Sequence, residues 1–214
     1  GMFDSLPKDL QTDTIIDMIV SEAVETSAIE GEYISRKDVL SSVRNNLGLN
    51  KSVKRVGDQR AEGIAEMMIA VRDAWQEPLS RKMLFAWHNM LMKGSEHISR
   101  GEWRKHPEPM RVVSGAVGAE TVHFEAPPSE RVSAEMDRYI AWFNDTGSKG
   151  TNHISWPPVR TAVAHLYFET IHPFEDGNGR IGRAISEKAL SQGLGRPALL
   201  SMSEAIEADR PEYY

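Results

Sequence analysis

Twelve consecutive residues decide the fold of this chain: His172-Pro173-Phe174-Glu175-Asp176-Gly177-Asn178-Gly179-Arg180-Ile181-Gly182-Arg183. An apolar run with helical spacing precedes them at residues 163–171, and a second one follows at residues 181–189. Gly177 and Gly179 free the backbone where the second helix begins. The stretch therefore predicts a turn between two helices within a mainly α fold.

The side chains of this turn suit phosphate chemistry. A helix start offers unpaired N–H groups and a positive dipole, and glycines let an anion approach closely. Asn178 adds a side-chain donor, and Arg180 and Arg183 add two cations one helical turn apart. Asp176 is a hard oxygen ligand suited to Mg²⁺, and His172 can accept a proton near neutral pH. Together they predict a site of phosphoryl or nucleotidyl transfer.

Each feature has an ordinary explanation when it occurs alone. Gly-Asn-Gly turns are common, and a histidine before proline is most often a loop residue. Arg180 and Arg183, three residues apart, would usually form a solvated helix face. Because all these features fall in one turn between two helices, their combination favours a catalytic site.

The same stretch resembles the signature of the Fic (filamentation induced by cAMP) domain, His-Pro-Phe-x-Asp/Glu-Gly-Asn-Gly-Arg-x-x-Arg, and matches every specified position. The resemblance implies the Fic fold, a helical bundle with a short β-hairpin called the flap. It also implies a protein adenylyltransferase (AMPylator), which transfers AMP from ATP to a Ser, Thr or Tyr hydroxyl of a target protein or of the chain itself.

The resemblance assigns roles to the residues of the signature. It implies that His172 deprotonates the target hydroxyl and that Asp176 holds Mg²⁺ between the α- and β-phosphates of ATP. It further implies an anion hole formed by Gly177, Asn178 and Gly179. Arg180 and Arg183 would hold the β- and γ-phosphates.

A helix predicted at about residues 12–30 carries apolar residues at helical spacing and is followed by Gly31 at its C-terminal stop. An isolated glutamate at such an end is ordinarily solvated. However, the last turn, Thr26-Ser27-Ala28-Ile29-Glu30-Gly31, is similar to the inhibitory helix of many Fic proteins. The resemblance implies that Glu30 pairs with Arg183 and takes the place of the γ-phosphate of ATP. A carboxylate at that guanidinium also repels the γ-phosphate, since both are negatively charged. We therefore expect an enzyme whose default state is off.

Two short β-prone runs flank a glycine-rich segment at residues 114–118 and predict a hairpin. If this hairpin is the flap, it holds an extended target segment by strand addition. The predicted flap residues are Val112, Val113, Thr121, Val122 and His123. His123 has no histidine or cysteine at zinc-ligand spacing, which disfavours a transition-metal site with His172.

Four further helices are predicted at residues 36–47, 58–76, 129–144 and 156–171, and another follows Ser80. We expect an N-terminal helical region at residues 1–57, with the inhibitory helix at about residues 12–31. A catalytic core at residues 58–214 would follow, truncated at its C-terminus. Met67 and Met68 are expected in the core rather than in a partner groove.

The composition excludes several classes of protein. The net charge is −6, which disfavours a nucleic-acid binder, and there is no cysteine for disulfide or thiol chemistry. No apolar run approaches the length of a membrane span, and the N-terminus lacks a signal peptide. We expect a soluble, cytoplasmic protein, and the resemblance also allows a homodimer.

Other functions remain open at this stage. Some Fic relatives remove AMP from modified targets, and others transfer different phosphate-linked groups. A chain of this kind could also be a catalytically silent module that binds a nucleotide or a partner, although the intact His172 argues against it.

Overall fold

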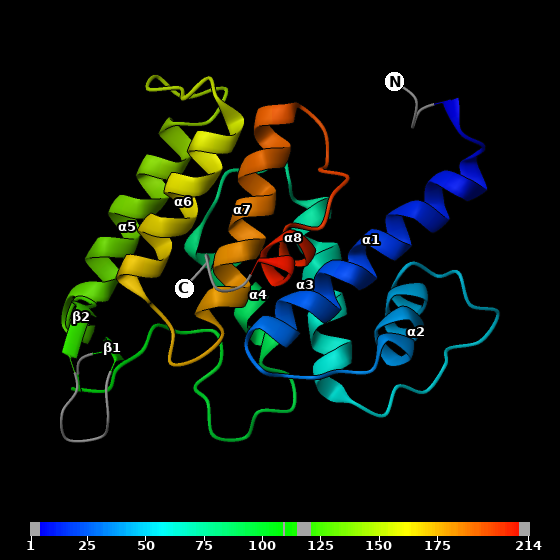
Figure 1. Ribbon diagram of the computed structural model, residues 1–214, viewed down its shortest axis with the longest axis horizontal. Helices are drawn as coiled ribbons and strands as arrows, with labels where there is room; N and C mark the ends of the chain where they lie inside the picture. The colour runs from blue at the N-terminus through cyan, green and yellow to red at the C-terminus, as the bar shows by residue number, and fades with distance from the viewer. Residues whose placement is uncertain (1–4, 109, 115–120, 210–214) are drawn as a thin grey trace.

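The computed structural model of the chain describes residues 5–108, 110–114 and 121–209. Within them lie eight helices and two strands (Figure 1). In chain order they are α1 (Lys8–Ile29), α2 (Arg36–Asn46), α3 (Gln59–Asp73), α4 (Arg81–Leu91), β1 (Arg111–Ser114), β2 (Thr121–Glu125), α5 (Ser129–Asp145), α6 (Pro157–Ile171), α7 (Asn178–Leu194) and α8 (Met202–Ala208). The fold is mainly helical with one hairpin, as predicted.

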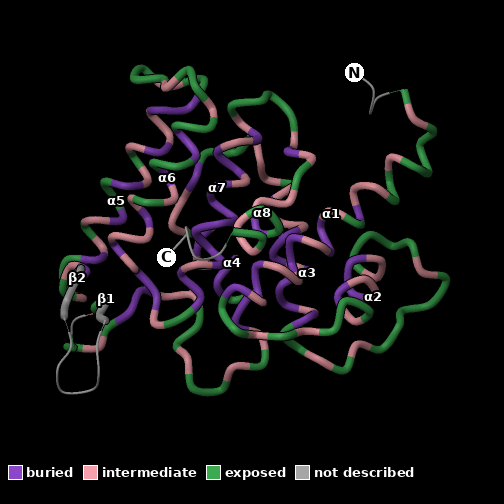
Figure 2. Tube along the Cα trace, viewed as in Figure 1, coloured by how far each residue is buried: buried purple, intermediate pink, exposed green. Residues whose placement is uncertain are grey.

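Helix α7, which begins inside the signature, is the central helix. It packs against α6 on one side and against α3, α4, α1 and α8 on the others, while α5 lies outside α6 (Figure 1). Most residues of α7 are buried, and burial is concentrated where α7, α3 and α4 meet (Figure 2). The second half of the signature therefore lies on the helix that is most completely surrounded by protein.

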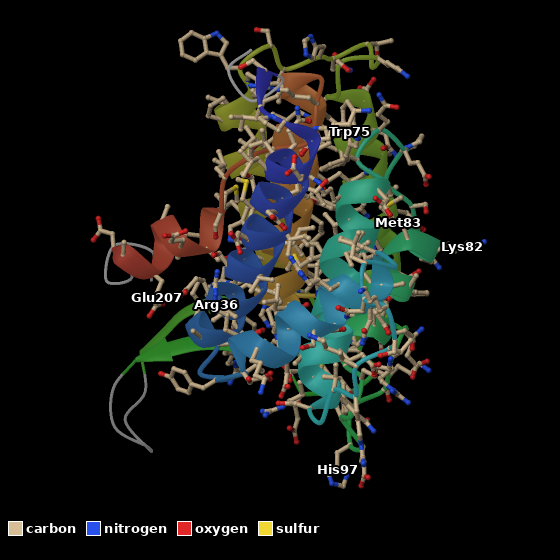
Figure 3. The ribbon with its side chains drawn as sticks, turned by 90° about the vertical axis from the view of Figure 1, so that its right-hand side faces the viewer. Arg36, Trp75, Lys82, Met83, His97 and Glu207 are labelled. Carbon is tan, nitrogen blue, oxygen red and sulfur yellow. The ribbon has the colours of Figure 1, made fainter. Side chains whose placement is uncertain are left out.

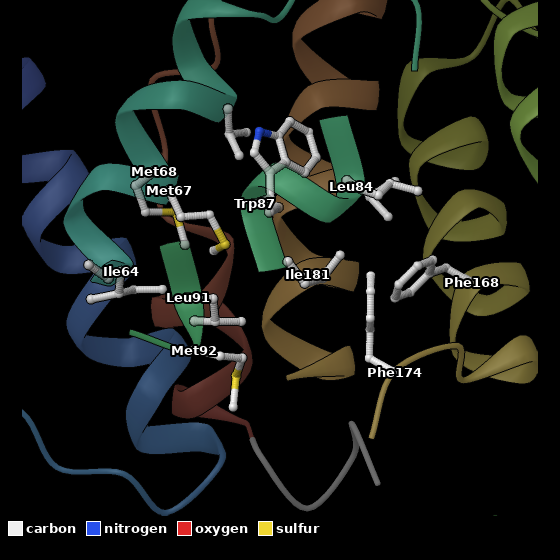
Figure 4. Close-up of a cluster of buried hydrophobic side chains, with 14 of the residues drawn as sticks. Ile64, Met67, Met68, Leu84, Trp87, Leu91, Met92, Phe168, Phe174 and Ile181 are labelled. Carbon is white, nitrogen blue, oxygen red and sulfur yellow. The ribbon is translucent and has the colours of Figure 1, made fainter. Parts of the chain in front are cut away.

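One continuous hydrophobic core joins these helices. Ile64, Met67 and Met68 from α3 face Leu84, Trp87 and Leu91 from α4, and Ile181 of α7 lies among them (Figure 4). Phe174 of the signature turn is fully buried in the same cluster. The two methionines fill the core, as expected. Burying a side chain of this size contributes about 2 kcal/mol, so the turn is anchored by its own phenylalanine.

Several helices begin at residues that are typical of helix starts. The Ser80 hydroxyl accepts a hydrogen bond from the backbone N–H of Met83, and Ser35 does the same for Asp38. Pro157 occupies the first turn of α6, where its missing N–H costs nothing. These local signals fix where α2, α4 and α6 start.

One helix starts earlier than predicted, and another was not predicted. Helix α1 begins at Lys8, about one turn before the predicted start at residue 12, with Pro7 as its N-cap. Thr12 lies inside the helix, where its hydroxyl donates to the Lys8 carbonyl. Helix α8 was not predicted. Its first turn is held by a tertiary contact, since the carboxylate of Glu22 in α1 accepts hydrogen bonds from the hydroxyl of Ser201 and the backbone N–H of Ser203. Figure 3 shows α8 beside α1, with Glu207 on it.

The predicted hairpin is present. Strands β1 and β2 pair in antiparallel register, from Arg111 opposite Glu125 to Ser114 opposite Thr121, with an irregularity between Val112 and Val113. The side chains of the five predicted flap residues lie outside the part that the structure describes. The hairpin projects from the end of the molecule at which α6 runs into the signature (Figure 1).

The predicted boundary between residues 57 and 58 falls in the connection between α2 and α3. The core nevertheless includes residues of α1 and α2 as well as of the later helices. Among the described residues, every helix is too short or too polar to cross a membrane.

Candidate active site

The backbone at His172 has an unusual conformation that buried contacts maintain. His172 caps the C-terminus of α6 with φ +49°, the one positive φ among the described residues other than glycine. Nε of Arg104 donates to the His172 carbonyl at 2.7 Å, and the Arg104 backbone N–H donates to the Pro173 carbonyl at 2.9 Å. Arg104 is 2% exposed, and its burial lowers the pKa of its guanidinium. This cation fixes the main chain from which the imidazole projects.

Asn178 closes the signature turn. Its side-chain oxygen accepts from the backbone N–H of Phe174 and its amide nitrogen donates to the Phe174 carbonyl, both at 2.9 Å. Asn178 is buried, and the structure thus shows a role in closing the turn that the sequence did not indicate, while its role as a phosphate donor stays a prediction. A short turn entering a helix leaves backbone groups unpaired, and this amide satisfies two of them.

A buried histidine supports the turn from below. The ring of His88 stacks on Phe174 with centroids 4.1 Å apart. Its Nδ1 accepts from the backbone N–H of Gly101 at 2.9 Å, so its Nε2 carries the proton and donates to the Asp176 carbonyl at 3.2 Å. Burial lowers the pKa of His88 to about 4, and the ring is neutral at physiological pH.

The structure brings Glu30 to Arg183 although the two are 153 residues apart in the chain. Nη2 of Arg183 lies 2.7 Å from Oε1 of Glu30, and the same nitrogen donates to the Thr26 carbonyl at 2.9 Å. Nε of Arg183 donates to the Thr26 hydroxyl at 2.7 Å. Arg183 is only 1% exposed, so the last turn of α1 surrounds a buried cation. Thr26, the first residue of the inhibitory pattern, has a role here that sequence reasoning did not assign.

Arg180 is held by a carboxylate that the sequence analysis missed. Its Nη1 lies 2.8 Å from Oε2 of Glu32, and its Nη2 lies 3.5 Å from Oδ1 of Asp176. Gly31 has φ +77°, and the backbone N–H groups of Gly31 and Glu32 donate to carbonyls of the last turn of α1. This left-handed helix end directs the residues on either side of the glycine toward α7. A glutamate in a polar loop carries no sequence signal for such a contact.

The Glu30 carboxylate lies over the first turn of α7. A Cβ added at Gly179 would come within 2.2 Å of Oε1 of Glu30. The absence of a side chain at this position thus leaves room for an anionic oxygen beside the helix start, where the dipole and the free N–H groups favour it. Gly177 precedes it as the N-cap of α7 with φ +79°, a conformation that glycine adopts without strain.

Asp176 is the carboxylate available to a metal ion in this turn. Its Oδ1 accepts from the Gly177 backbone N–H at 2.6 Å, and its side chain is 49% exposed. No group of three or more potential metal-binding side chains occurs among the described residues. Mg²⁺ commonly binds through one carboxylate together with phosphate oxygens and water, so the donor set fits a metal that arrives with a nucleotide.

Two cavities differ in their relation to the signature. A cavity of about 60 Å³ lies between the hairpin and the end of α6, lined by Met110, Arg111, Phe124, Ala126, Glu169 and His172. A larger one of about 650 Å³ lies between α1 and α8 and has no basic residue in its lining. The small cavity adjoins the predicted base, whereas the large one lacks the cations that a phosphate group would need.

Comparison with known proteins places these features in a family. The Fic/DOC family profile matches residues 78–190, slightly more than half of the chain, and the profile "Domain of unknown function (DUF4172)" matches residues 1–49. A protein adenylyltransferase Fic from Drosophila ananassae is 22% identical over 190 residues, which are 88% of this chain and 34% of that protein. The protein adenylyltransferase fic-1 of Caenorhabditis briggsae is 29% identical over 85 residues, which are 40% of this chain and 15% of that protein.

A solved structure shows the same architecture. The crystal structure of a Fic family protein from Desulfovibrio desulfuricans G20 is 27% identical, with a TM-score of 0.68, and the match covers 99% of this chain and 58% of that one. The chain thus spans about a third of the Drosophila protein and somewhat more than half of the bacterial one.

Proposed function

The chain belongs to the Fic/DOC family, and from this premise we propose that it is a protein adenylyltransferase that Glu30 inhibits. It transfers AMP from ATP to the hydroxyl of a Ser, Thr or Tyr side chain in a target protein. Adenylyltransferases among its relatives support the reaction, and the ion pairs at the start of α7 support the inhibition. One observation carries the proposal: two buried arginines at a helix N-terminus are paired with carboxylates from another segment of the chain.

The arginines and the helix start would hold the phosphates of ATP. Arg180 and Arg183 each present a guanidinium whose planar donors suit phosphate oxygens as well as carboxylates. The N–H groups of the first turn of α7 add partial positive charge, and Gly179 leaves space for the ligand. These groups would neutralise the charge that moves onto the leaving pyrophosphate, which is the main contribution expected in such a transfer.

His172 would act as the base. The target hydroxyl gives its proton to the imidazole while its oxygen forms a bond to the α-phosphorus. The bond from that phosphorus to the pyrophosphate oxygen breaks, and pyrophosphate leaves with the electron pair. Because Arg104 and Asn178 hold the backbone on both sides of the ring, the imidazole is placed before the substrate arrives.

Asp176 would hold Mg²⁺ together with phosphate oxygens of the nucleotide. The bound metal supplies charge neutralisation at the phosphates. The side chain of Asp176 is half exposed and oriented by the Gly177 N–H, which leaves its second oxygen free for this role.

Glu30 would inhibit by occupying the place of the γ-phosphate. Its carboxylate is 2.7 Å from Nη2 of Arg183, a distance typical of a charge-assisted hydrogen bond. The negative charge of Glu30 would repel a phosphate oxygen that approached Arg183, and Arg183 would already be paired with the carboxylate. ATP would then bind weakly or with its α-phosphate turned away from attack.

The experiment that tests this function uses Glu30→Gly. After incubation with Mg²⁺ and ATP, we expect mass spectrometry to show added AMP on the variant chain or on a candidate target. Calorimetry should show ATP binding at least roughly tenfold tighter than in the wild type. His172→Ala in the same background should retain the tighter binding and lose the transfer. Asp13→Asn, which removes a surface carboxylate of α1 that pairs with Arg44, is the matched control and should behave like the wild type.

Two results would overturn the proposal. Unchanged ATP affinity in Glu30→Gly would exclude inhibition through Arg183. Tighter ATP binding without AMP on the chain or on any tested target would favour a silent nucleotide-binding module instead.

A further inference from the structure

A second carboxylate lies beside the predicted base. Glu169 precedes His172 by three residues at the end of α6, and its Oε2 is 3.6 Å from Nδ1 of His172. Both side chains are partly buried, with 26% and 34% of their surface exposed. Among the described residues, Glu169 is the only carboxylate within ion-pair distance of this ring. The distance is long for a hydrogen bond, as is common for catalytic pairs before the substrate binds.

One oxygen of the Glu169 carboxylate faces the imidazole of His172, and the other lies against α7. Its other oxygen, Oε1, is buried and has no hydrogen-bond partner in the described part of the chain. A Cβ at Gly182 of α7 would come within 2.4 Å of this oxygen, so the glycine makes room for it. A buried, unpaired carboxylate oxygen costs free energy, and such a group usually has a role beyond stability.

We propose that Glu169 is a positioning residue for His172, an inference that rests on the proposed function. Its carboxylate accepts a hydrogen bond from the Nδ1–H group, which keeps the proton on Nδ1 and fixes the tautomer in which the lone pair is on Nε2. Nε2 lies on the opposite side of the ring and becomes the atom that takes the proton. Arg104 fixes the backbone of His172 through the carbonyl, and Glu169 fixes the ring.

The location of the pair agrees with this role. Glu169 and His172 line the small cavity whose remaining walls come from the base of the hairpin. In the proposed reaction, the target hydroxyl would lie between the hairpin and the imidazole. When Nε2 takes the hydroxyl proton, the ring becomes an imidazolium, and the negative charge of Glu169 stabilises it while the oxygen bonds to phosphorus and pyrophosphate leaves.

The first test needs no activity. In the full chain labelled with ¹⁵N-histidine, NMR should show His172 with its proton on Nδ1. Glu169→Ala should shift the ring toward the Nε2–H tautomer, whereas Glu169→Gln, which keeps an acceptor oxygen, should retain the wild-type tautomer. An Nε2–H tautomer in the wild type, or no change in Glu169→Ala, would overturn the proposal, whatever reaction the chain catalyses.

The second test separates positioning from structure. In the Glu30→Gly background, Glu169→Gln should lower kcat by roughly 10- to 100-fold and leave the KM for ATP unchanged, because the charge acts on the base and not on the nucleotide. Glu175→Gln is the matched control: Glu175 follows His172 by three residues, but its carboxylate accepts from the backbone N–H of Ser99. It should leave kcat unchanged. An unchanged kcat in Glu169→Gln, or equal losses in both variants, would refute the role of Glu169.

Discussion

The two ends of helix α7 hold buried cations in different ways. At its N-terminal end, Arg180 and Arg183 pair with the carboxylates of Glu32 and Glu30. Toward its C-terminal end, Lys188 lies in α7 and Arg160 approaches from α6. Lys188 donates to backbone carbonyls, and Arg160 donates to two carbonyls and to two uncharged side chains. All four cations are at most 3% exposed, so burial alone does not distinguish them.

The cations of the C-terminal half close helix ends. Nη2 of Arg160 donates to the Phe143 carbonyl near the end of α5 at 2.7 Å, and its guanidinium lies over the Phe143 ring. Nζ of Lys188 donates to the carbonyls of Ala74 and Trp75, directly after α3. Burial lowers the pKa of Lys188 to about 8. These contacts satisfy orphan carbonyls, which the covalent chain holds in place.

The difference shows which buried charges can exchange partners. A carbonyl at a helix end cannot leave without unfolding the helix. The carboxylates of Glu30 and Glu32 are on rotatable side chains that are 31% and 29% exposed, so they can move away when another anion takes their place. The N-terminal end of α7 is therefore suited to binding and the C-terminal end to stability.

The largest expected effect concerns Arg160, at the C-terminal end of α7. Arg160→Met should lower the free energy of unfolding by roughly 3 kcal/mol, since it removes the hydrogen bonds of the guanidinium to the Phe143 and Ala189 carbonyls and its contact with the Phe143 ring. Urea denaturation with and without Mg²⁺ and ATP measures this loss. We expect the nucleotide to restore none of it, and a recovery specific to this variant would contradict the distinction between the two ends.

The contribution of His88, which packs under the signature turn, to the free energy of unfolding should depend on pH. Burial lowers the pKa of His88 from 6.5 to about 4. Between these two pH values His88 is protonated in the unfolded chain and neutral in the folded chain. The stabilising contribution is complete above about pH 6.5 and is lost as the pH falls toward 4, with a total of about 3 kcal/mol. The unfolding free energy of the wild type relative to His88→Gln should fall across this interval.

The two proteins share all their other titrating groups, so those contributions cancel in the difference. Among them is Glu187, whose pKa burial raises to about 8. A difference that stays constant between pH 7 and pH 4.5 would show that His88 is not held neutral.

The smallest effect concerns the carboxylate that the sequence did not reveal. Glu32→Gln should free Arg180, and in the Glu30→Gly background it should tighten ATP binding by a further factor of roughly 3, equivalent to about 0.6 kcal/mol. Calorimetry measures the difference, with Asp13→Asn in the same background as the control. If Glu32→Gln weakens ATP binding instead, its carboxylate orients Arg180 rather than competing for it.

Much of this arrangement could be predicted because its signals are local. The signature turn, the helices around it and the hairpin follow from periodicity, caps and glycines within a few residues of each other. The contact between Glu30 and Arg183 spans the chain, and it was expected only from the resemblance of a six-residue pattern. The inhibitory effect of this contact and the catalytic roles within the signature stay predictions.

The missed features depend on tertiary structure. The contact of Glu32 with Arg180 requires the left-handed turn at Gly31 and the packing of α1 against α7. The hydrogen bonds of Arg104 and His88 to the signature backbone join segments that are far apart in sequence. No periodicity or motif in either segment encodes such a contact.

Helix α1 is anchored from Ile16 onward, and this limits how Glu30 can move. Ile16, Ile19, Val20 and Ala23 are buried in the core, and Glu22 holds the start of α8. Detaching the whole helix would expose apolar groups worth several kcal/mol, a large fraction of the stability of an entire domain. Rotation of one glutamate side chain or unwinding of the last turn costs far less. In the proposed mechanism, a local motion of one turn would therefore be enough to open access to Arg183, while the rest of the molecule keeps its structure.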